Sequence, residues 1–430
     1  MPRRRAIVVA LDGLGIDLLA PALAAGGLPA LAELAGADGP TPVAARPPAS
    51  PQAAWTTFTT ASNPGRHGIF GLTHPGRQLR IRVTSADHVR MPTLWERAAT
   101  DGLQSVVVGL PGTYPARRMS GALVAGYVVA DEARLAHPRS LAPRLAASGY
   151  RSDVDVSAAR DDPDRFTEEL RGSVAARIEV MRQLIASDRW SLAILAFPEL
   201  DRWGHAMRRR AAAGDEQASA ALGGMLEAID GFVGELRRAH PAARMLALSA
   251  HGVAAVDRTL NIEAWLVEGG YLRPGPDGRP GEGTAAFSME SGRIYLHAAR
   301  MFEAGRLGGG SVMPLMDEIA DGLTGLRADD GSRPLDAVLR RRDLYDGPHA
   351  RVGPHLVAAP AQGWAVVSSH HIPTESRAGR TEGAHRHDLA FVLGDLKRES
   401  AAPSLENLGA TVLSHLGLYA ADVDGRAVSD

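Results

Sequence analysis

The sequence contains no cysteine and only one lysine, Lys397, and aromatic residues make up 5% of it. Without cysteine the chain can form no disulfide bond and can offer no thiolate to a metal, so any bound metal must be held by histidine, aspartate or glutamate. Charge of one sign is not in excess either, because the formal net charge is -2. A chain without a strong electrostatic field is not drawn to nucleic acid or to an anionic membrane surface, and we expect neither as a partner.

Long hydrophobic runs are missing as well. No segment reaches the roughly 20 consecutive apolar residues that a membrane-spanning helix needs. The first residues, "MPRRRAIVVALDGLG", place basic residues before a short apolar run, but that run stops at Asp12 and lacks a small-residue cleavage site. We therefore interpret this segment as a first β-strand rather than a signal peptide, and we expect a soluble cytoplasmic protein.

The chain has 430 residues, of which 45% are hydrophobic, and this is enough for a large core. Short apolar runs alternate with longer stretches of helical periodicity. Such alternation predicts an α/β fold with a mostly parallel central sheet and helices on both of its faces. The expected strands are 6–11, 105–109, 123–129, 191–197, 245–248, 365–368 and 389–393, and the expected helices include 94–100, 164–187 and 211–239.

Two segments rich in proline and glycine, 272–283 and 305–314, interrupt this alternation in the second half of the chain. Between them lies a stretch with strand and turn signals of its own. We interpret residues 265–350 as an inserted cap or small subdomain. The main domain would then be formed by residues 1–264 and 351–430.

Acidic and histidine side chains recur where the predicted strands end. Asp12 and His251 each follow a strand closely, and the carboxyl end of a buried parallel strand is a common ligand position. Asp201 and His205 lie four residues apart after another strand, so on a helix they share one face and can bind one cation. His385 precedes the strand 389–393. Taken singly, each could be a helix cap or a surface residue, but together they predict a metal site at one edge of the sheet.

The segment 47–72, "PPASPQAAWTTFTTASNPGRHGIFGL", predicts a helix that begins after Ser50. Ser50 and Pro51 form a favourable N-cap and first-turn pair, and the helix stops at the turn "NPG". A hydroxyl at a helix N-terminus lies beside free amide groups, which suits a nucleophile that attacks an anionic ester. Ser50 is therefore a candidate nucleophile, and the alternative is that it only caps the helix.

With these residues in view, the chain resembles the type I phosphodiesterase/nucleotide pyrophosphatase family of the alkaline phosphatase superfamily. The resemblance runs along nearly the whole chain, in order and in spacing. It implies an alkaline-phosphatase-like three-layer sandwich with a small inserted subdomain. The matching segments are "VALDGLG", "AAWTTFTTASNPGRHGIFGL", "TLWERAATDGLQSVVVGLPGTYPA", "LDRWGH", "LSAHGVAAVDRTLNIEAWLVEGGYL", "RRDLYDGP" and "GAHRHD".

The resemblance also implies a centre of two zinc or zinc-like ions, and for this chain we expect one or two Zn²⁺, with Mn²⁺ or another divalent metal as alternatives. The first metal would be held by Asp201, His205 and His385. The second would be held by Asp12, the nucleophile, His251 and an aspartate directly before that histidine. This chain has Ala250 at that last position, so the resemblance implies an incomplete second site.

The position of the nucleophile departs from the family pattern as well. Counting back ten residues from Ala61, which stands where the family has glycine, leads to Pro51, which has no nucleophilic group. Ser50 lies one residue further away and would need a one-residue slip or a bulge at the helix start. Thr56 and Thr57 are the other hydroxyls of this helix, and we rank them below Ser50.

We therefore expect a metal-dependent phosphodiesterase or phosphomonoesterase, a hydrolase or transferase of small phosphate esters with a Ser or Thr nucleophile. Arg66 and Arg202 are candidates for binding the phosphate, and His387 or Asp388 for replacing the missing ligand. One alternative is a catalytically degenerate family member that binds a ligand or partner. Another is a repurposed single-metal enzyme of biosynthesis. The sequence indicates neither the substrate nor the oligomeric state.

Overall fold

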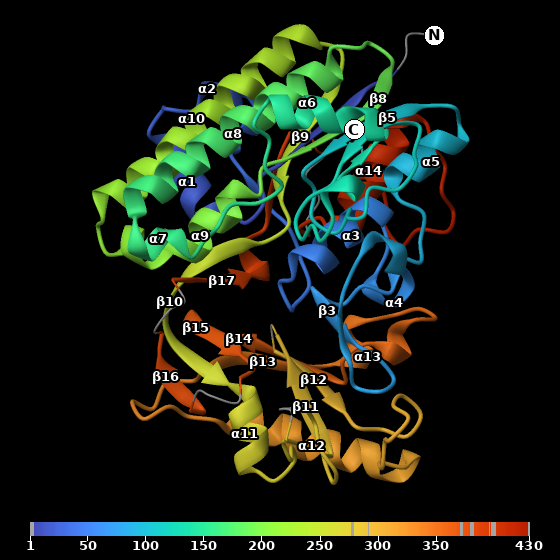
Figure 1. The fold of residues 1–430 in the computed structure, drawn as a ribbon, viewed down its shortest axis with the longest axis vertical. Helices are drawn as coiled ribbons and strands as arrows, with labels where there is room; N and C mark the ends of the chain where they lie inside the picture. The colour runs from blue at the N-terminus through green and yellow to red at the C-terminus, as the bar shows by residue number, and fades with distance from the viewer. Residues whose placement is uncertain are drawn as a thin grey trace.

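The structure, a computed structural model, describes residues 4–276, 279–290, 292–369, 373–378, 382–394, 396 and 401–428. Two lobes are stacked along the long axis of the molecule, and the chain crosses between them several times (Figure 1). The upper lobe contains both termini of the described chain and the larger sheet. The lower lobe is formed mainly by residues from the second half of the sequence.

The upper lobe is built on an eight-stranded mixed sheet. Its five central strands, β9, β1, β8, β5 and β6, run parallel, and the strands at the two edges are antiparallel to their neighbours. All residues of β1 and β8 are buried, as expected for parallel strands covered on both faces. The order is β2 (Thr41–Pro42), β18 (Phe391–Leu393), β9 (Arg244–Ser249), β1 (Ala6–Ala10), β8 (Trp190–Ala196), β5 (Gln104–Val108), β6 (Gly121–Val124) and β7 (Ala136–His137).

Helices cover both faces of this sheet, so the predicted three-layer α/β architecture is confirmed (Figure 1). One layer contains α1 (Ile16–Ala24), α2 (Pro29–Ala35), α8 (Pro163–Ile185), α9 (Glu199–Ala212) and α10 (Glu216–Ala239), and the other contains α3 (Pro51–Thr60), α5 (Leu94–Thr100) and α14 (Leu405–Leu416). Shorter helices are α4 (Pro64–His67), α6 (Ala142–Ala147) and α7 (Ala158–Asp161).

Two local predictions can be compared directly with these helices. Thr93 caps α5 with a capping box, because its side chain accepts from the amide of Glu96 and the Glu96 carboxylate accepts from the amide of Thr93. The helix expected at 211–239 is interrupted, since α9 ends at Ala212 and Asp215 caps the start of α10. Among the described residues no single helix is long and apolar enough to cross a membrane, although the bent pair α1 and α2 passes that test jointly.

The lower lobe has a hydrophobic core of its own, drawn from residues between Leu260 and Trp364. Strand β10 (Gly252–Asn261) follows the carboxyl end of β9 and runs down from the upper sheet into the lower lobe. It pairs with β15 (Gly363–Val367), β16 (Glu375–Arg377) and β17 (Gly383–Arg386). A second sheet has the order β11 (Ala286–Met289), β12 (Arg293–Leu296), β14 (Leu356–Pro360) and β13 (Leu335–Arg340). The helices of the lower lobe are α11 (Ile262–Glu268), α12 (Gly309–Gly325) and α13 (Arg341–Leu344). A hairpin of β3 (Thr73–Pro75) and β4 (Ile81–Val83) extends from the upper lobe towards the lower lobe.

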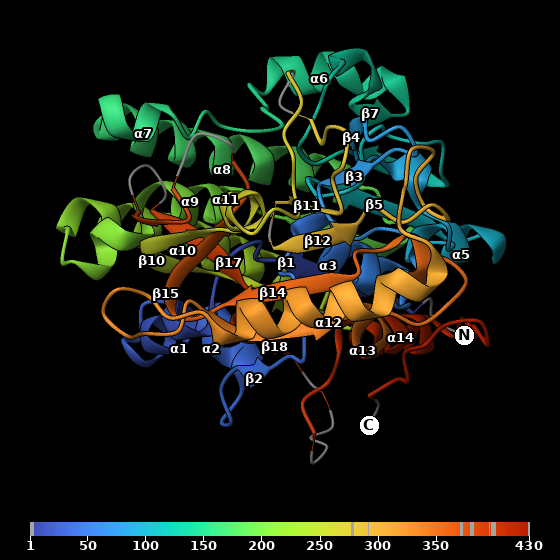
Figure 2. The ribbon, with the colours of Figure 1, turned by 90° about the horizontal axis from the view of Figure 1, so that it is seen from below.

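Figure 2, seen from below, shows α12 lying across the lower lobe in front of β14. The core of this lobe includes residues of β14 and β15, which lie beyond the expected insertion 265–350. The division of the chain at 264 and 351 remains a prediction.

Helix α9, which carries two of the predicted ligands, is fixed at its start by a buried ion pair. The Arg177 guanidinium donates from Nε to Glu199 Oε1 at 2.8 Å, and the two side chains are 1% and 2% exposed. Ser173 donates to the same oxygen, and Arg177 also donates to the hydroxyl of Tyr150. Because both charges are out of water, each depends on the other for compensation.

We predict that Arg177→Met lowers the free energy of unfolding by about 3–5 kcal/mol, because Glu199 is left buried without a cation. Urea denaturation followed by circular dichroism measures this. The matched control is Arg182→Met in the same helix, where the ion pair with Glu235 is 46% and 45% exposed. That change should cost about 1 kcal/mol or less, and equal losses for the two variants would contradict the argument.

Candidate metal and nucleophile site

Three neighbouring strands of the central sheet deliver polar side chains to the same edge. Strands β9, β1 and β8 lie side by side and parallel, so their carboxyl ends meet there. Asp12 follows β1, His251 follows β9, and Asp201 lies in the first turn of α9, the helix after β8. All three side chains are fully buried.

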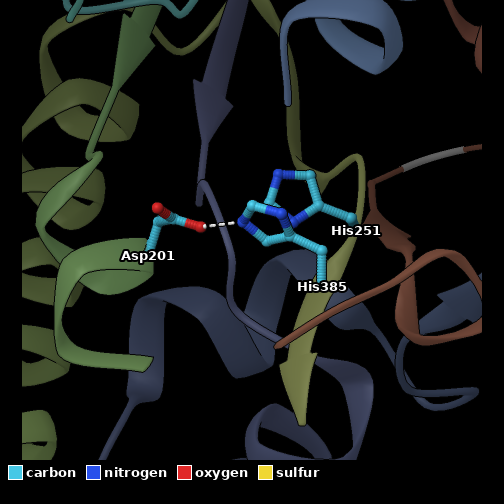
Figure 3. Close-up of side chains that lie close together, drawn as sticks. All are labelled: Asp201, His251 and His385. Atoms are coloured by element: carbon cyan, nitrogen blue, oxygen red, sulfur yellow. Dashed lines mark hydrogen bonds and ion pairs between the residues drawn. The ribbon is translucent and has the colours of Figure 1, made fainter. Parts of the chain in front are cut away.

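Two further imidazoles complete the cluster from α9 and β17. His205 lies one helical turn after Asp201, as the spacing predicts. His385 stands opposite Val253 in the antiparallel pair of β17 with β10, and Figure 3 shows its ring turned towards the Asp201 carboxylate. The structure therefore brings together all five residues that the sequence analysis proposed as metal ligands.

The ligand atoms of Asp201, His205 and His385 converge closely. His385 Nε2 lies 2.8 Å from Asp201 Oδ1 and 2.8 Å from His205 Nε2, and His205 Nε2 lies 3.6 Å from Asp201 Oδ1. Ligands bonded to zinc at about 2.0–2.1 Å in a tetrahedron are about 3.3 Å apart, which is the scale of this triangle.

Hydrogen bonds around these side chains leave their acceptor atoms facing one another. His205 Nδ1 lies 3.0 Å from the carbonyl oxygen of Gly383, so this nitrogen carries the proton and Nε2 keeps its lone pair. Burial lowers the pKa of His385 to about 4, even though the Asp201 carboxylate opposes this shift, so the ring is neutral near pH 7. For Asp201 burial raises the pKa, but the hydrogen bond with His385 and the charge of Arg202 act in the opposite direction, and the pKa lies below its ordinary value.

This arrangement fits a divalent cation. Asp201 Oδ1, His205 Nε2 and His385 Nε2 all carry lone pairs and face one another. A proton on His385 Nε2 can form a hydrogen bond with only one of the other two atoms at a time, whereas a metal ion that replaces this proton can bind all three. Two imidazoles and one carboxylate are also a donor set typical of catalytic zinc, which uses three protein ligands and keeps one position open. Asp201, His385 and His251 additionally place ligand atoms within 4.8 Å of one another.

Asp12 has a different environment, because protein donors already surround its carboxylate. Trp55 Nε1 donates to Oδ1 at 2.6 Å, and His251 Nε2 lies 3.1 Å from the same oxygen. The hydroxyl of Tyr127 donates to Oδ2 at 3.2 Å. Ala250, at the position where the resemblance implies an aspartate, is buried and offers only a methyl group. The residues around Asp12 therefore fit a metal ion less well than Asp201, His205 and His385 do, because hydrogen-bond donors already occupy the Asp12 carboxylate.

Ser50 is the N-cap of α3, which begins at Pro51 as predicted. Its hydroxyl makes no capping bond and donates one long hydrogen bond, to Gln52 Oε1 at 3.4 Å. The hydroxyls of Thr56 and Thr57 are engaged, the first with the Gln52 carbonyl at 2.6 Å and the second with His67 at 3.0 Å. Of the three candidate nucleophiles, Ser50 has the hydroxyl that is least committed to other groups.

A pocket of about 280 Å³ adjoins the cluster. His205 and His385 form part of its wall, and Pro47, Pro48 and Ala49, the residues just before Ser50, form another part. The remaining wall comes largely from β14, β15 and β17 of the lower lobe, so the pocket lies between the lobes. Its size suits a small ligand rather than a macromolecule.

Three of the other candidate residues, Arg202, Arg66 and Asp388, form ion pairs with oppositely charged side chains. Arg202 pairs with Asp153 through Nε and Nη2 and with Asp201 through Nη1. Arg66 pairs with Asp424 at 3.0 Å. The Asp388 carboxylate accepts from Arg386 at 2.8 and 2.6 Å. Arg202 therefore orients a predicted ligand, while the roles proposed for Arg66 and Asp388 gain no support from these contacts. His387 lines the pocket.

The sequence analysis missed Trp55 and Tyr127, which both donate to Asp12. Trp55 looks like an ordinary core residue of an apolar helix face, and Tyr127 follows the end of β6 without any charged neighbour. Tyr127 could have been placed near the site from the order of the strands, because residues that follow parallel strands lie at the same edge of the sheet. This placement could not be made without knowing the sheet order.

The comparisons with known proteins identify the class of this protein as a phosphoester hydrolase of the alkaline phosphatase superfamily. The chain belongs to the type I phosphodiesterase/nucleotide pyrophosphatase family, which it matches over residues 6–388. The resemblance noted in the sequence is thereby confirmed. No curated protein sequence gave a significant match.

Solved structures share the fold over nearly the whole chain. Phosphonoacetate hydrolase from Sinorhizobium meliloti, in complex with phosphonoacetate, has a TM-score of 0.62 and 18% identity, with 97% of this chain and 96% of that chain covered. Murine ectonucleotide pyrophosphatase/phosphodiesterase 5 has a TM-score of 0.55 and 14% identity, with 98% and 97% covered. The human counterpart has a TM-score of 0.57 and 15% identity, with the same coverage. An inactive form of the murine protein was solved in complex with AMP. These likenesses confirm the alkaline-phosphatase-like fold.

Gly13 allows the end of β1 to approach Asp201, and this contact generates a prediction. Its φ is +78°, and a Cβ there would lie 2.6 Å from Asp201 Cα and 2.9 Å from Oδ1. We predict that Gly13→Ala displaces Asp201 and weakens metal binding by about tenfold or more, as measured by competition with a chromogenic chelator.

The control for this change is Gly26→Ala. Gly26 has nearly the same φ, +80°, but nothing lies within 4 Å of its added Cβ. This variant bears only the backbone cost of about 1–2 kcal/mol and should keep its metal affinity. Similar affinities for the two variants would show that the approach of Gly13 to Asp201 does not matter.

Proposed function

We propose that this protein is a metal-dependent phosphoester hydrolase or transferase that binds one divalent cation through Asp201, His205 and His385. The observation that carries the proposal is the triangle of ligand atoms, 2.8, 2.8 and 3.6 Å apart, with His205 held in the correct tautomer. Zn²⁺ is the proposed ion, because it favours imidazole nitrogen combined with one carboxylate, and Mn²⁺ is the alternative.

Each residue of the site has a part in this proposal. A bound divalent ion would supply Lewis-acid stabilisation of a phosphoryl oxygen. Arg202 holds Asp201 in place through its contact with Oδ2, and it is itself fixed by Asp153 and by the ring of Tyr127, 3.9 Å below its guanidinium. The Gly383 carbonyl holds the ring of His205. These contacts keep the ligand set assembled before a substrate arrives.

Ser50 is the proposed nucleophile. It lies at the N-terminus of α3, where the first amide groups of a helix have no partner within the helix. Such amides stabilise the negative charge of a phosphoryl group that is being attacked. In the proposed reaction Ser50 Oγ loses its proton and forms a bond to phosphorus while the bond to the ester oxygen breaks, and the departing alcohol takes up a proton. Water or an acceptor hydroxyl then attacks the phosphoserine, takes the phosphoryl group, and returns Ser50 to its free, protonated form.

The pocket between the lobes is the proposed substrate site. The same histidines that form the ligand triangle line it, and its other walls are largely proline, alanine and valine. A small-molecule phosphate ester with an apolar substituent matches this lining.

The experiment is turnover of an aryl phosphomonoester and an aryl phosphodiester with added Zn²⁺ or Mn²⁺. We expect hydrolysis of at least one of them, its loss on chelation and its recovery on adding the metal back. Ser50→Ala should lower kcat by about 10³-fold or more while leaving the metal content unchanged.

Two controls accompany this test. Thr56→Val removes a hydroxyl that is already bonded within the helix and should retain most of the activity. Full activity of Ser50→Ala would exclude the serine nucleophile and point to direct attack by water. A protein that binds the metal but hydrolyses neither ester would favour the degenerate family member over the enzyme.

A further inference from the structure

The carboxylate of Asp12 has almost no free capacity to bind a metal. A carboxylate offers about four lone-pair positions, two on each oxygen. Trp55 and His251 take both positions on Oδ1, at 2.6 and 3.1 Å, and Tyr127 takes one on Oδ2 at 3.2 Å. Neither Trp55 nor Tyr127 can bind zinc in its neutral form. Their hydrogen bonds to Asp12 therefore occupy positions on the carboxylate that a metal would otherwise take.

The other residues of the second position add little. Ala250 has no donor atom, and Ser50 contacts Gln52 rather than Asp12. His251 Nδ1 is buried and has no hydrogen-bond partner among the described residues. One free imidazole nitrogen and one free carboxylate position are fewer than the three protein ligands of a catalytic zinc.

The charges lead to the same conclusion. Arg202 donates two hydrogen bonds to Asp153 and one to Asp201, so its single positive charge offsets one of the three carboxylates Asp12, Asp153 and Asp201. Asp12 and Asp201 are both fully buried. Two negative charges remain, and one divalent cation balances them. A second ion would leave two positive charges in excess inside the protein, which is costly without further anionic ligands.

We propose that this protein is a mononuclear member of its family, in which hydrogen bonds from Trp55, Tyr127 and His251 replace the second metal. The inference rests on the proposed function, since it takes the cation at Asp201, His205 and His385 as given. Asp12 then acts as a positioning residue. Trp55 belongs to α3, the helix that begins directly after Ser50, so its bond to Asp12 ties the nucleophile's helix to β1.

The test compares metal content after dialysis in two isosteric variants, measured by inductively coupled plasma mass spectrometry. Wild-type protein should retain one equivalent of Zn²⁺. Asp12→Asn should retain it as well, because the amide oxygen still accepts from Trp55 and His251. Asp201→Asn should lose it, because a first-site ligand is gone. Two equivalents in the wild type, or loss of metal in Asp12→Asn, would overturn the inference.

A gain-of-site variant tests the replacement itself. Ala250→Asp should still bind one equivalent, because the donors to Asp12 remain, whereas Ala250→Asp combined with Trp55→Phe should bind two. A second equivalent of metal bound by Ala250→Asp alone would contradict the role of Trp55. So would the absence of a second equivalent in the variant that combines Ala250→Asp with Trp55→Phe. The single variant Trp55→Phe should keep its metal and its KM and lose about tenfold or more in kcat, and an unchanged kcat would contradict positioning through Asp12.

The results separate this inference from the proposed function. Wild-type protein with two equivalents and phosphoesterase activity would leave the function standing and overturn only the mononuclear site. Wild-type protein that binds no metal would overturn both.

Discussion

Two buried carboxylates, the buried imidazole of His251 and two partly buried imidazoles form one cluster at the carboxyl ends of β1, β8 and β9, and buried charge of this density is unstable unless it is compensated. The parallel order β9, β1, β8 brings these groups together, while β10 and β17 bring His385 from a distant part of the chain. Gly13 makes the close approach to Asp201 possible, and the buried pair of Arg177 and Glu199 fixes the start of α9. Much of the upper lobe can be understood as the support that holds Asp201 and His205 against His385.

The two halves of the cluster are compensated in different ways. At Asp201 the acceptor atoms face one another and call for a cation. At Asp12 they face Trp55, Tyr127 and His251, which already supply hydrogen bonds. The family resemblance implies a carboxylate at position 250, where this chain has alanine, and without it two metals would exceed the negative charge of Asp12 and Asp201. In this account α3 and Ser50 are held in place by the hydrogen bond from Trp55 to Asp12, which follows β1.

The sequence predicted the α/β class, the covered parallel strands and the family, because apolar strand runs and strand-end polar residues are local signals. It also predicted the start of α3 at Pro51 and the grouping of Asp12, Asp201, His205, His251 and His385, whose roles as ligands remain predictions. It could not show that Trp55 and Tyr127 contact Asp12 or that Arg202 is committed to Asp153, because such contacts depend on the sheet order and on packing between distant segments. The break between α9 and α10 was missed because helical periodicity continues across it.

The number of metal ions and their positions test the central claim most directly. A crystal of the zinc-loaded protein, with diffraction data collected on both sides of the zinc absorption edge, gives an anomalous difference map in which each ion is a separate peak. The account predicts one peak, bonded to Asp201 Oδ1, His205 Nε2 and His385 Nε2, and Asp12 still bonded to Trp55. A second peak of similar height between Asp12 and His251 would contradict the mononuclear site, and a map without any peak at His205 and His385 would contradict the metal-dependent function.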